Sequence, residues 1–560
     1  MTDRRIVLAG VLLSAICLAY FHALDRVLFS SVSFSPIFRH LLSVYDFQAA
    51  RLSLAICVLA AVWTRPAPVL RLVDFFAKHP YSISMACTAL FALGTVVVYH
   101  GYPLSMDEYA AVFQSKIFAC GHLFAQFPRD LVDWLVVRGF NGSFLVASPV
   151  SGKAIGHYWP GFAALLTPFE FLKAPWLCNA SLSGLSMFLI YSITSQVTDD
   201  RRAAGWALLF TVASGAFVAD AISYYSMQAH MAANLLFVAL LLKPTEDRAL
   251  GAGLVGSLAL TLHNPVPHAL FAIPWVTAML IEREQRRYLL PLLLGYVPGV
   301  AIGLGWLFFR ADIGAGVQGV SVRGVTDGVF AWPDAAMLNM RTAALIKMWV
   351  WALPCVLIFA LAGYLRHRGN PHVRRLTQSA LLTFAGYLFV RFDQGHGWGY
   401  RYFHSAWGVI PILAGCAMTG RSDMRQRLVS FAGAAAVLNL VVMIPFQMHQ
   451  IDEFISQHLA LLPPPQRPGN NVYFVHPRGG FYVADMVQFD PLLRDRDLTL
   501  VSHGAELDAE LVRRNWPNAV HIASAGTADQ WYLGPEDQRV PIPGSEFQKR
   551  FVFTAGQLGP

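Results

Sequence analysis

The residues of this chain that are best suited to chemistry are two adjacent carboxylates, Asp107 and Glu108, in the segment SMDEYAAVFQSKIFACGHL. An apolar stretch long enough to cross a bilayer ends just before them, so we expect both at a membrane surface. Carboxylates are costly inside lipid, and a pair at the edge of a bilayer therefore indicates a site. In a group transfer, such a carboxylate can take the proton from an acceptor hydroxyl.

A structural explanation competes with the chemical one at this pair. Ser105 and Glu108 have the spacing of a capping box, and Asp107 in a first helical turn suits the helix dipole. The sequence therefore predicts that a helix begins here. It leaves open whether the two carboxylates act in catalysis, in capping, or in both.

A second candidate site lies in the segment RFDQGHGWGYRYFH, residues 391–404. Its three alternating glycines predict a tight turn in which the backbone comes close to another group. Arg401 then stands at the start of the next helix, where N–H groups and a guanidinium can face one anion. We expect Arg401 and His396 to bind a phosphate in this way. The competing explanation is a snorkelling arginine among the aromatic residues of a membrane interface.

Other polar side chains gather at the same ends of the apolar stretches. Single histidines and tyrosines there commonly form interfacial hydrogen bonds, so each also has a structural explanation. The candidates that we expect to contact substrate are Tyr225, His263, Tyr400 and Tyr402.

Membrane-spanning helices must position these residues. Of the 560 residues, 55% are hydrophobic and only 14% are charged, and the mean hydropathy is +0.47. Apolar runs of about 17–25 residues have the length of a transmembrane helix. Phe162–Leu172 is too short to cross and predicts an interfacial or re-entrant helix. The thirteen predicted spans are 6–28, 44–64, 81–100, 176–197, 203–220, 227–243, 249–264, 267–282, 288–309, 341–365, 376–391, 404–419 and 427–446.

The basic residues predict the orientation of these spans. With the N-terminus in the cytoplasm, every short basic loop also falls on the cytoplasmic side. The net charge of +8 is therefore a topology signal, and its spread over many loops excludes a nucleic-acid patch. The first outer loop, residues 101–175, and everything after residue 447 are then expected outside.

The chain is thus expected to be an α-helical polytopic membrane protein with a small extracytoplasmic α/β domain at its C-terminus. Residues 1–446 form the transmembrane module, 447–469 a linker with the sequence PPPQRPG at its end, and 470–560 the α/β domain. That domain shows strand-like NVYFVHP, AVHIAS and FQKRFVFT and helix-like LDAELVRRNW. The seven cysteines lie almost all in predicted spans, which argues against a disulfide framework or a cysteine zinc site.

Three motifs over residues 1–450 resemble the GT-C membrane glycosyltransferases that use polyprenyl-phosphate sugars. They are the acidic pair followed by a helix ending at Gly121-His122, YWPGFAALLTP at 158–168, and GYRYFHSAWGVIPIL at 399–413. Within that superfamily the chain looks most like the aminoarabinose lipid A transferases, the protein O-mannosyltransferases and lipopolysaccharide-sugar transferases. The order of the motifs and the layout of spans add to the resemblance.

The resemblance implies roles for particular residues. Asp107 matches the loop carboxylate expected to act as base or to bind the acceptor, with Glu108 as its neighbour. Arg401 matches a position expected near the donor phosphate. The chain departs from the aminoarabinose type where a lysine precedes two prolines, because it reads His157-Tyr158-Trp159-Pro160-Gly161. Lys153 or His157 is then expected to contact the phosphate instead.

The resemblance also implies partners and a location. The expected donor is a polyprenyl-phosphate-linked sugar, the acceptor a glycan, lipid or protein of the cell envelope, and the location the bacterial inner membrane. No cofactor is expected with certainty, and whether a divalent cation takes part stays open. The competing functions are a transporter or flippase and an enzyme like the O-antigen ligases. A transporter should carry ionisable residues in the middle of its spans, whereas here they lie at span ends.

Overall fold

The computed structural model describes residues 3–23, 35–317, 320, 329–420, 426–465, 467, 469–479, 482–524 and 526–535. The chain forms two compact units. The first combines Met1–Gly101, Trp176–Ile302 and Gly328–Asp452, and the second combines Tyr102–Pro175, Gly303–Asp327 and Glu453–Pro560. The two carboxylates and the glycine-spaced turn therefore belong to different units.

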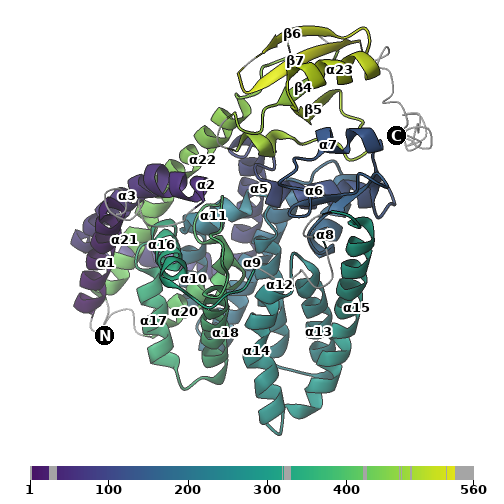
Figure 1. Ribbon diagram of the computed structural model, residues 1–560. Helices are drawn as coiled ribbons and strands as arrows, with labels where there is room; N and C mark the ends of the chain where they lie inside the picture. The colour runs from purple at the N-terminus through teal and green to yellow at the C-terminus, as the bar shows by residue number, and fades with distance from the viewer. Residues whose placement is uncertain are drawn as a thin grey trace. The chain divides into compact units, whose positions relative to one another are not determined.

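The first unit is built from helices (Figure 1). They are α1 (Asp3–Ala23), α2 (Pro36–His40), the π-helix η2 (Leu41–Asp46), α3 (Phe47–Val62), α4 (Ala67–Lys78), α5 (Pro80–Val97), α9 (Leu177–Thr198), α10 (Arg201–Val212), α11 (Gly215–Ala221), α12 (Met227–Leu241), α13 (Glu246–Thr261), α14 (Val266–Ile281), most of α15 (Leu289–Ile313), α16 (Ala335–Trp351), α17 (Val356–His367), α18 (Pro371–Tyr387), α19 (His404–Trp407), α20 (Val409–Ala417), α21 (Gln426–Leu438) and the start of α22 (Ile444–Leu459).

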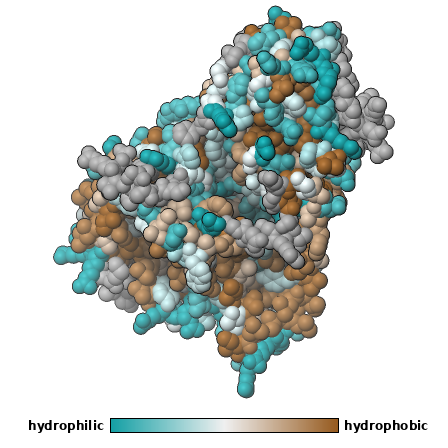
Figure 2. All heavy atoms as spheres, viewed as in Figure 1, coloured by the Kyte–Doolittle hydropathy of each residue, from teal (hydrophilic) through white to brown (hydrophobic). Residues whose placement is uncertain are grey.

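Small residues let these helices approach one another closely. A Cβ on Gly253 of α13 would lie 2.1 Å from the carbonyl oxygen of Leu292, and one on Gly363 of α17 would lie 1.8 Å from that of Leu413. Close backbone approach at small residues is how helices pack in lipid, where apolar burial gives no preference for a neighbouring helix. Elsewhere apolar side chains stay exposed, as along α15, and Figure 2 shows apolar surface over α13, α14 and α15.

Within the described ranges, six helices are long and apolar enough to cross a membrane, or up to eight if two bent pairs each count as one span. One pair, α10 and α11, bends by 67°, and the other, α16 and α17, by 94°. Every predicted span contains helix, so the helical membrane architecture is confirmed. The count of thirteen stays a prediction, because several of those helices are shorter than a full crossing.

The second unit contains two small sheets. Strands β1 (Ala125–Gln126), β2 (Leu145–Ala147) and β3 (Lys153–Gly156) form an antiparallel sheet in the order β1-β3-β2. Strands β4 (Asn470–Val475), β5 (Asp497–Val501), β6 (Val520–Ser524) and β7 (Ala528–Gly534) form the other, in the order β5-β4-β7-β6 with one parallel pair, β4 and β5. Its α-helices are α6 (Met106–Ala119), α7 (Val132–Leu135), α8 (Gly161–Phe171) and α23 (Ala505–Asn515), together with the ends of α15 and α22.

One apolar core joins the loop after α5 to the C-terminal sheet. Phe113 and Phe127 from the loop region lie in the same cluster of buried residues as Phe489, Val472 and Leu500. The rings of Phe113 and Phe489 are 6.2 Å apart, edge to face. Two segments far apart in the sequence therefore fold as one body.

The C-terminal region shows most of the elements expected of it. NVYFV forms β4, LDAELVRRN lies in α23, and AVHIAS contains β6. The expected strand FQKRFVFT lies outside the described residues. Helix α22 continues to Leu459, so the first part of the predicted linker is helical. The division of the chain at residues 446 and 469 stays a prediction.

Candidate active site

The first turn of α6 places the two carboxylates differently. The Glu108 side chain is fully buried, and its Oε2 accepts hydrogen bonds from the backbone N–H and the hydroxyl of Ser105, both at 3.1 Å. The capping box therefore forms, and it accounts for the position of Glu108 without a catalytic role. Asp107, one residue earlier, is only half-buried.

The Asp107 carboxylate meets the segment that follows β3. The hydroxyl of Tyr158 donates a hydrogen bond to Oδ1 of Asp107. Tyr158 is in turn fixed by its own backbone, since its carbonyl accepts from the indole N–H of Trp306 at 2.9 Å. A carboxylate that is oriented by a phenol and still partly open to its surroundings is suited to accept a proton from a bound hydroxyl.

Beside Tyr158, the structure adds a cation that the sequence did not single out. Arg310, near the end of α15, is 4% exposed, and its Nη1 lies 3.2 Å from Nε2 of His157 and 3.3 Å from the carbonyl oxygen of His157. No described residue accepts a hydrogen bond from its Nε. A buried guanidinium with a donor left over can bind an oxyanion. Its only signal in the sequence is one arginine at the end of an apolar run.

Lys153 is the first residue of β3, four residues before His157. Its Nζ lies 4.9 Å from the centre of the Phe124 ring. Lys153, His157, Arg310 and Asp107 thus all belong to the second unit. This set contains the candidate base and three candidate phosphate ligands.

A further carboxyl group, which the sequence did not single out, bonds the first turn of the same helix. Asp485 is 7% exposed, and its Oδ1 accepts from the backbone N–H of Met106 at 2.7 Å. Burial, together with the nearby charges of Asp107 and Glu108, raises the pKa of Asp485 to about 8, against the opposing effect of the Met106 N–H. Asp485 is therefore a neutral acid at pH 7.

In the first unit, the predicted tight turn is confirmed. Gly395, Gly397 and Gly399 have φ values of 61°, 137° and 73°, a region that favours glycine. The backbone also comes close to a neighbour, because a Cβ on Gly399 would lie 2.9 Å from the Cβ of Ala216. The turn is tied internally by Gln394, whose amide donates to the carbonyl oxygens of Gly397 at 3.2 Å and Gly399 at 2.9 Å.

Arg401 is held by this turn. Its backbone N–H donates to Oε1 of Gln394 at 2.9 Å, and its Nη2 donates to the carbonyl oxygen of Gln394 at 2.5 Å. Its guanidinium lies 4.4 Å over the ring of Tyr225, whose hydroxyl is 2.9 Å from Nδ1 of His396. Three predicted site residues, Arg401, Tyr225 and His396, are therefore in one cluster. The helix that Arg401 begins is a single 3₁₀ turn, Arg401–Phe403.

The remaining candidates lie around this cluster or apart from it. The Tyr402 hydroxyl donates to the carbonyl oxygen of Asp393 at 2.8 Å, and the Tyr402 ring is 6.0 Å from the Arg401 guanidinium. Burial raises the pKa of Tyr400 to about 12, so its phenol stays protonated at neutral pH. His263 lies half-buried between α13 and α14.

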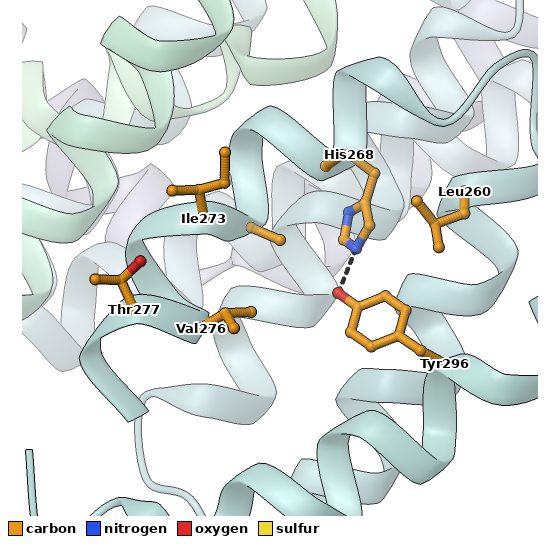
Figure 3. A pocket seen from close by; sticks show the side chains of 8 residues that line it. Leu260, His268, Ile273, Val276, Thr277 and Tyr296 are labelled. Atoms are coloured by element: carbon orange, nitrogen blue, oxygen red, sulfur yellow. Dashed lines mark hydrogen bonds between the residues drawn. The ribbon is translucent and has the colours of Figure 1, made fainter. Parts of the chain in front are cut away.

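Helices α13, α14 and α15 line a pocket of about 270 Å³ (Figure 3). Its walls are mainly apolar, with Leu260, Ile273 and Val276 among them. One wall is polar and contains two hydrogen bonds of His268. Its Nε2 lies 2.7 Å from the Tyr296 hydroxyl, and its Nδ1 lies 2.7 Å from Oδ1 of Asn234. The mainly apolar lining of the pocket suits a hydrocarbon chain.

A buried ion pair lies elsewhere in the first unit. Nζ of Lys347 is 2.7 Å from Oδ2 of Asp46, and neither side chain is exposed. The indole N–H of Trp351 donates to the other Asp46 oxygen at 2.6 Å. Lys347 falls inside the predicted span 341–365, whereas Asp46 lies at the start of the span 44–64, so the expectation that ionisable residues lie only at span ends is wrong for Lys347.

Among the described residues, no three His, Cys, Asp or Glu side chains are grouped as metal ligands would be. Glu108 and Asp485, whose carboxyl groups lie near Asp107, accept backbone hydrogen bonds.

Comparison with solved structures shows that this arrangement is similar in fold to that of ArnT. No protein-family model and no curated protein matches the chain. The solved structure of ArnT from Cupriavidus metallidurans, a GT-C aminoarabinose transferase, bound to undecaprenyl phosphate, is similar with a TM-score of 0.52, covering 81% of this chain and 98% of that chain at 12% identity. The apo ArnT structure matches with a TM-score of 0.48 at 13% identity and the same coverage. The resemblance expected from the sequence is confirmed as a likeness of fold.

Proposed function

We propose that this protein is an integral membrane glycosyltransferase, which moves a sugar from a polyprenyl-phosphate donor to a glycan, lipid or protein acceptor outside the inner membrane of a bacterium. The observation that carries the proposal is the hydrogen bond between the half-buried Asp107 carboxylate and Tyr158. The residue next to Tyr158, His157, contacts the guanidinium of Arg310. A base and an anion-binding group that contact adjacent residues suit a group transfer, in which an acceptor hydroxyl loses a proton and a phosphate leaves. The ArnT-like fold supports the same reaction class.

In the proposed reaction, Asp107 takes the proton of the acceptor hydroxyl. The acceptor oxygen then bonds to the anomeric carbon of the sugar, and the bond between that carbon and the phosphate oxygen breaks. The polyprenyl phosphate leaves as an anion. Arg310 and His157, with Lys153 nearby, are proposed to stabilise the negative charge on this leaving group.

The donor proposal rests on undecaprenyl phosphate, which the similar ArnT structure contains. We expect the purified protein in detergent to bind undecaprenyl phosphate, measured by native mass spectrometry. Arg310→Ala should bind it on the order of 10-fold or more weaker, because a hydrogen bond to a charged group contributes about 1.5–3 kcal/mol. Arg513→Ala, at an exposed arginine of the same unit, is the matched control. Absence of binding by the unmodified protein would contradict the donor, and equal binding by Arg310→Ala would contradict the role of Arg310.

The proposed sidedness has a separate test. Single cysteines at Ser151, Ser502 and Asn370, in a background without the native cysteines, are exposed to a membrane-impermeant thiol reagent in intact cells. The positive-inside pattern predicts labelling at the first two positions and none at the third. Labelling at Asn370→Cys alone would reverse the topology and remove Asp107 from the outer face.

A transporter is the second candidate, and the Lys347–Asp46 ion pair is the observation that favours it. Ionisable residues inside spans mark ion and substrate pathways, and bent helices such as α16 and α17 are common in transporters. The two functions separate in sealed vesicles containing the purified protein. A transporter moves labelled substrate across the bilayer with no new glycosidic bond, whereas the proposed enzyme forms that bond in detergent, where no second compartment exists.

A further inference from the structure

The start of α6 is bonded to a loop 379 residues further along the chain, in which Asp485 belongs to the short 3₁₀ helix η9 (Val483–Met486). Oδ1 of Asp485 accepts from the backbone N–H of Met106 at 2.7 Å, and Nε2 of Gln488 donates to the carbonyl oxygen of Pro103 at 2.7 Å. Gln488 also donates to the carbonyl oxygen of Asp485 at 2.9 Å, which ties the two partners together. The loop therefore contacts the chain on both sides of the position where the helix begins.

One turn later, the same loop contacts the helix again. The hydroxyl of Tyr109 donates to the carbonyl oxygen of Phe489 at 2.6 Å and accepts from the N–H of Phe489 at 3.0 Å. Tyr109 is 2% exposed, so both bonds are shielded from water. Two-way bonding through one phenol fixes the distance between the helix and the loop.

These contacts act on the residue next to the proposed base. The first N–H groups of a helix have no partner within the helix and need acceptors from elsewhere. At α6, Glu108 supplies an acceptor for Ser105, and Asp485 supplies one for Met106. Met106 immediately precedes Asp107, so losing the Asp485 bond releases the peptide that sets the direction of the Asp107 side chain.

We infer that Asp485, with Gln488 and Phe489, is a positioning residue for Asp107, which makes the C-terminal α/β region part of the catalytic apparatus. This inference rests on the proposed function. Asp485 contacts no reacting atom, and it acts by fixing the first turn of α6. Small displacements of a catalytic group from its reactive geometry are costly, which is why the turn needs this support.

The protonation state of Asp485 explains why a carboxyl group can accept this hydrogen bond beside two other carboxyl groups. The titratable groups that face Asp485 are Asp107 and Glu108 of α6 and Tyr102 of the preceding loop. With its pKa raised to about 8, Asp485 is neutral below that pH and adds no negative charge beside Asp107. Its ordinary pKa is about 3.9, so its contribution to the folded site is complete below that value and is lost as the pH rises through about 8. Above pH 8 the ionised group repels its two neighbours.

The test is a set of variants of the full-length protein in a sugar-transfer assay. Asp485→Ala removes the acceptor, and kcat should fall on the order of 10-fold or more, with KM for the donor changed less than about twofold. Asp485→Asn keeps an acceptor oxygen for Met106, so it should retain wild-type kcat at pH 7 and lose the decline above pH 8 that the wild type shows. Asp508→Ala is the matched control, because Asp508 is a buried carboxylate of the same region that bonds Ser502 and His503 away from α6.

Hydrogen exchange gives a second readout. In Asp485→Ala, the amides of residues 106–110 should exchange faster than in wild type, while in Asp508→Ala they should not. Wild-type kcat in Asp485→Ala, an equal loss in Asp508→Ala, or an alkaline decline unchanged in Asp485→Asn would each overturn the inference. Failure of the proposed function is distinct, because there the unmodified protein transfers no sugar, and the inference then falls with it.

Discussion

The start of α6 and the turn at residues 394–401 are both sharp backbone features that present a charged side chain, but they are stabilised in opposite ways. The turn is closed by its own residues, since Gln394 bonds Gly397, Gly399 and Arg401. The helix start depends on Asp485 and Phe489, which lie about 380 residues away. The local turn should therefore tolerate change elsewhere in the chain, whereas the geometry around Asp107 should respond to substitutions in a distant region.

The largest effect is expected at Asp107. Asp107→Asn keeps the size of the side chain and an oxygen for the Tyr158 hydroxyl, but it cannot accept a proton at neutral pH. Sugar transfer should fall about 10²-fold or more, the typical contribution of a general base. The measurement is turnover of purified protein with a polyprenyl-phosphate sugar, with expression and thermal stability as controls. A wild-type rate would reduce Asp107 to a helix-start residue.

Arg401 is expected to give the next largest effect. If it faces the donor phosphate, Arg401→Lys keeps the charge but loses the fork that can bind two oxygens, so donor affinity should fall on the order of 10-fold. A snorkelling arginine would instead allow lysine full activity. The structure adds a third outcome, because the guanidinium already donates to Gln394 and lies over Tyr225.

Affinity and stability together separate these outcomes for Arg401→Lys. A lower melting temperature with unchanged donor affinity would make Arg401 part of the turn and leave Arg310, His157 and Lys153 as the phosphate ligands. Weakened affinity with an unchanged melting temperature would place Arg401 at the donor. Wild-type values of both would favour the snorkelling explanation.

The turn itself is expected to show a smaller effect, on stability. Gly399→Ala forces a Cβ toward Ala216 at 2.9 Å and a positive φ on an alanine, and it should destabilise the protein by about 1–3 kcal/mol. Gly395→Ala is the matched control, since Gly395 also has a positive φ but has open space where a Cβ would lie. Thermal unfolding in detergent measures both. An equal loss in the two variants would show that φ, and not the contact with Ala216, determines the requirement for glycine.

Part of the fold and of the candidate site could be predicted from the sequence. The helix start at Asp107, the capping box and the glycine-spaced turn are local patterns, and the structure contains all three. The helical membrane architecture was equally predictable, because length and hydropathy are local too. The number of spans stays a prediction, because α10 and α16 end in bends of 67° and 94° that hydropathy does not encode.

The residues that the sequence did not reveal have partners far away in the chain. Arg310 matters through His157, 153 residues earlier, and Asp485 through Met106, 379 residues earlier. Asp485 lies in an ordinary segment, YVADMVQF, with no motif to mark it. Its burial and its raised pKa arise only when the loop packs under α6. A single sequence does not contain that pairing as a local signal.

The smallest effect is expected at Glu108, and it is the sharpest test of how the acidic pair divides its work. The buried Glu108 carboxylate already accepts two hydrogen bonds from Ser105, so Glu108→Gln keeps an acceptor for the capping box and removes only a charge. Charge near a helix N-terminus contributes about 0.3–1 kcal/mol, which limits the expected loss of rate to roughly fivefold. Glu108→Ala removes the acceptor as well and should lower stability by about 0.5–2 kcal/mol. If Glu108→Gln instead abolishes transfer with an unchanged melting temperature, the two carboxylates act together, and capping by Glu108 is incidental to its role.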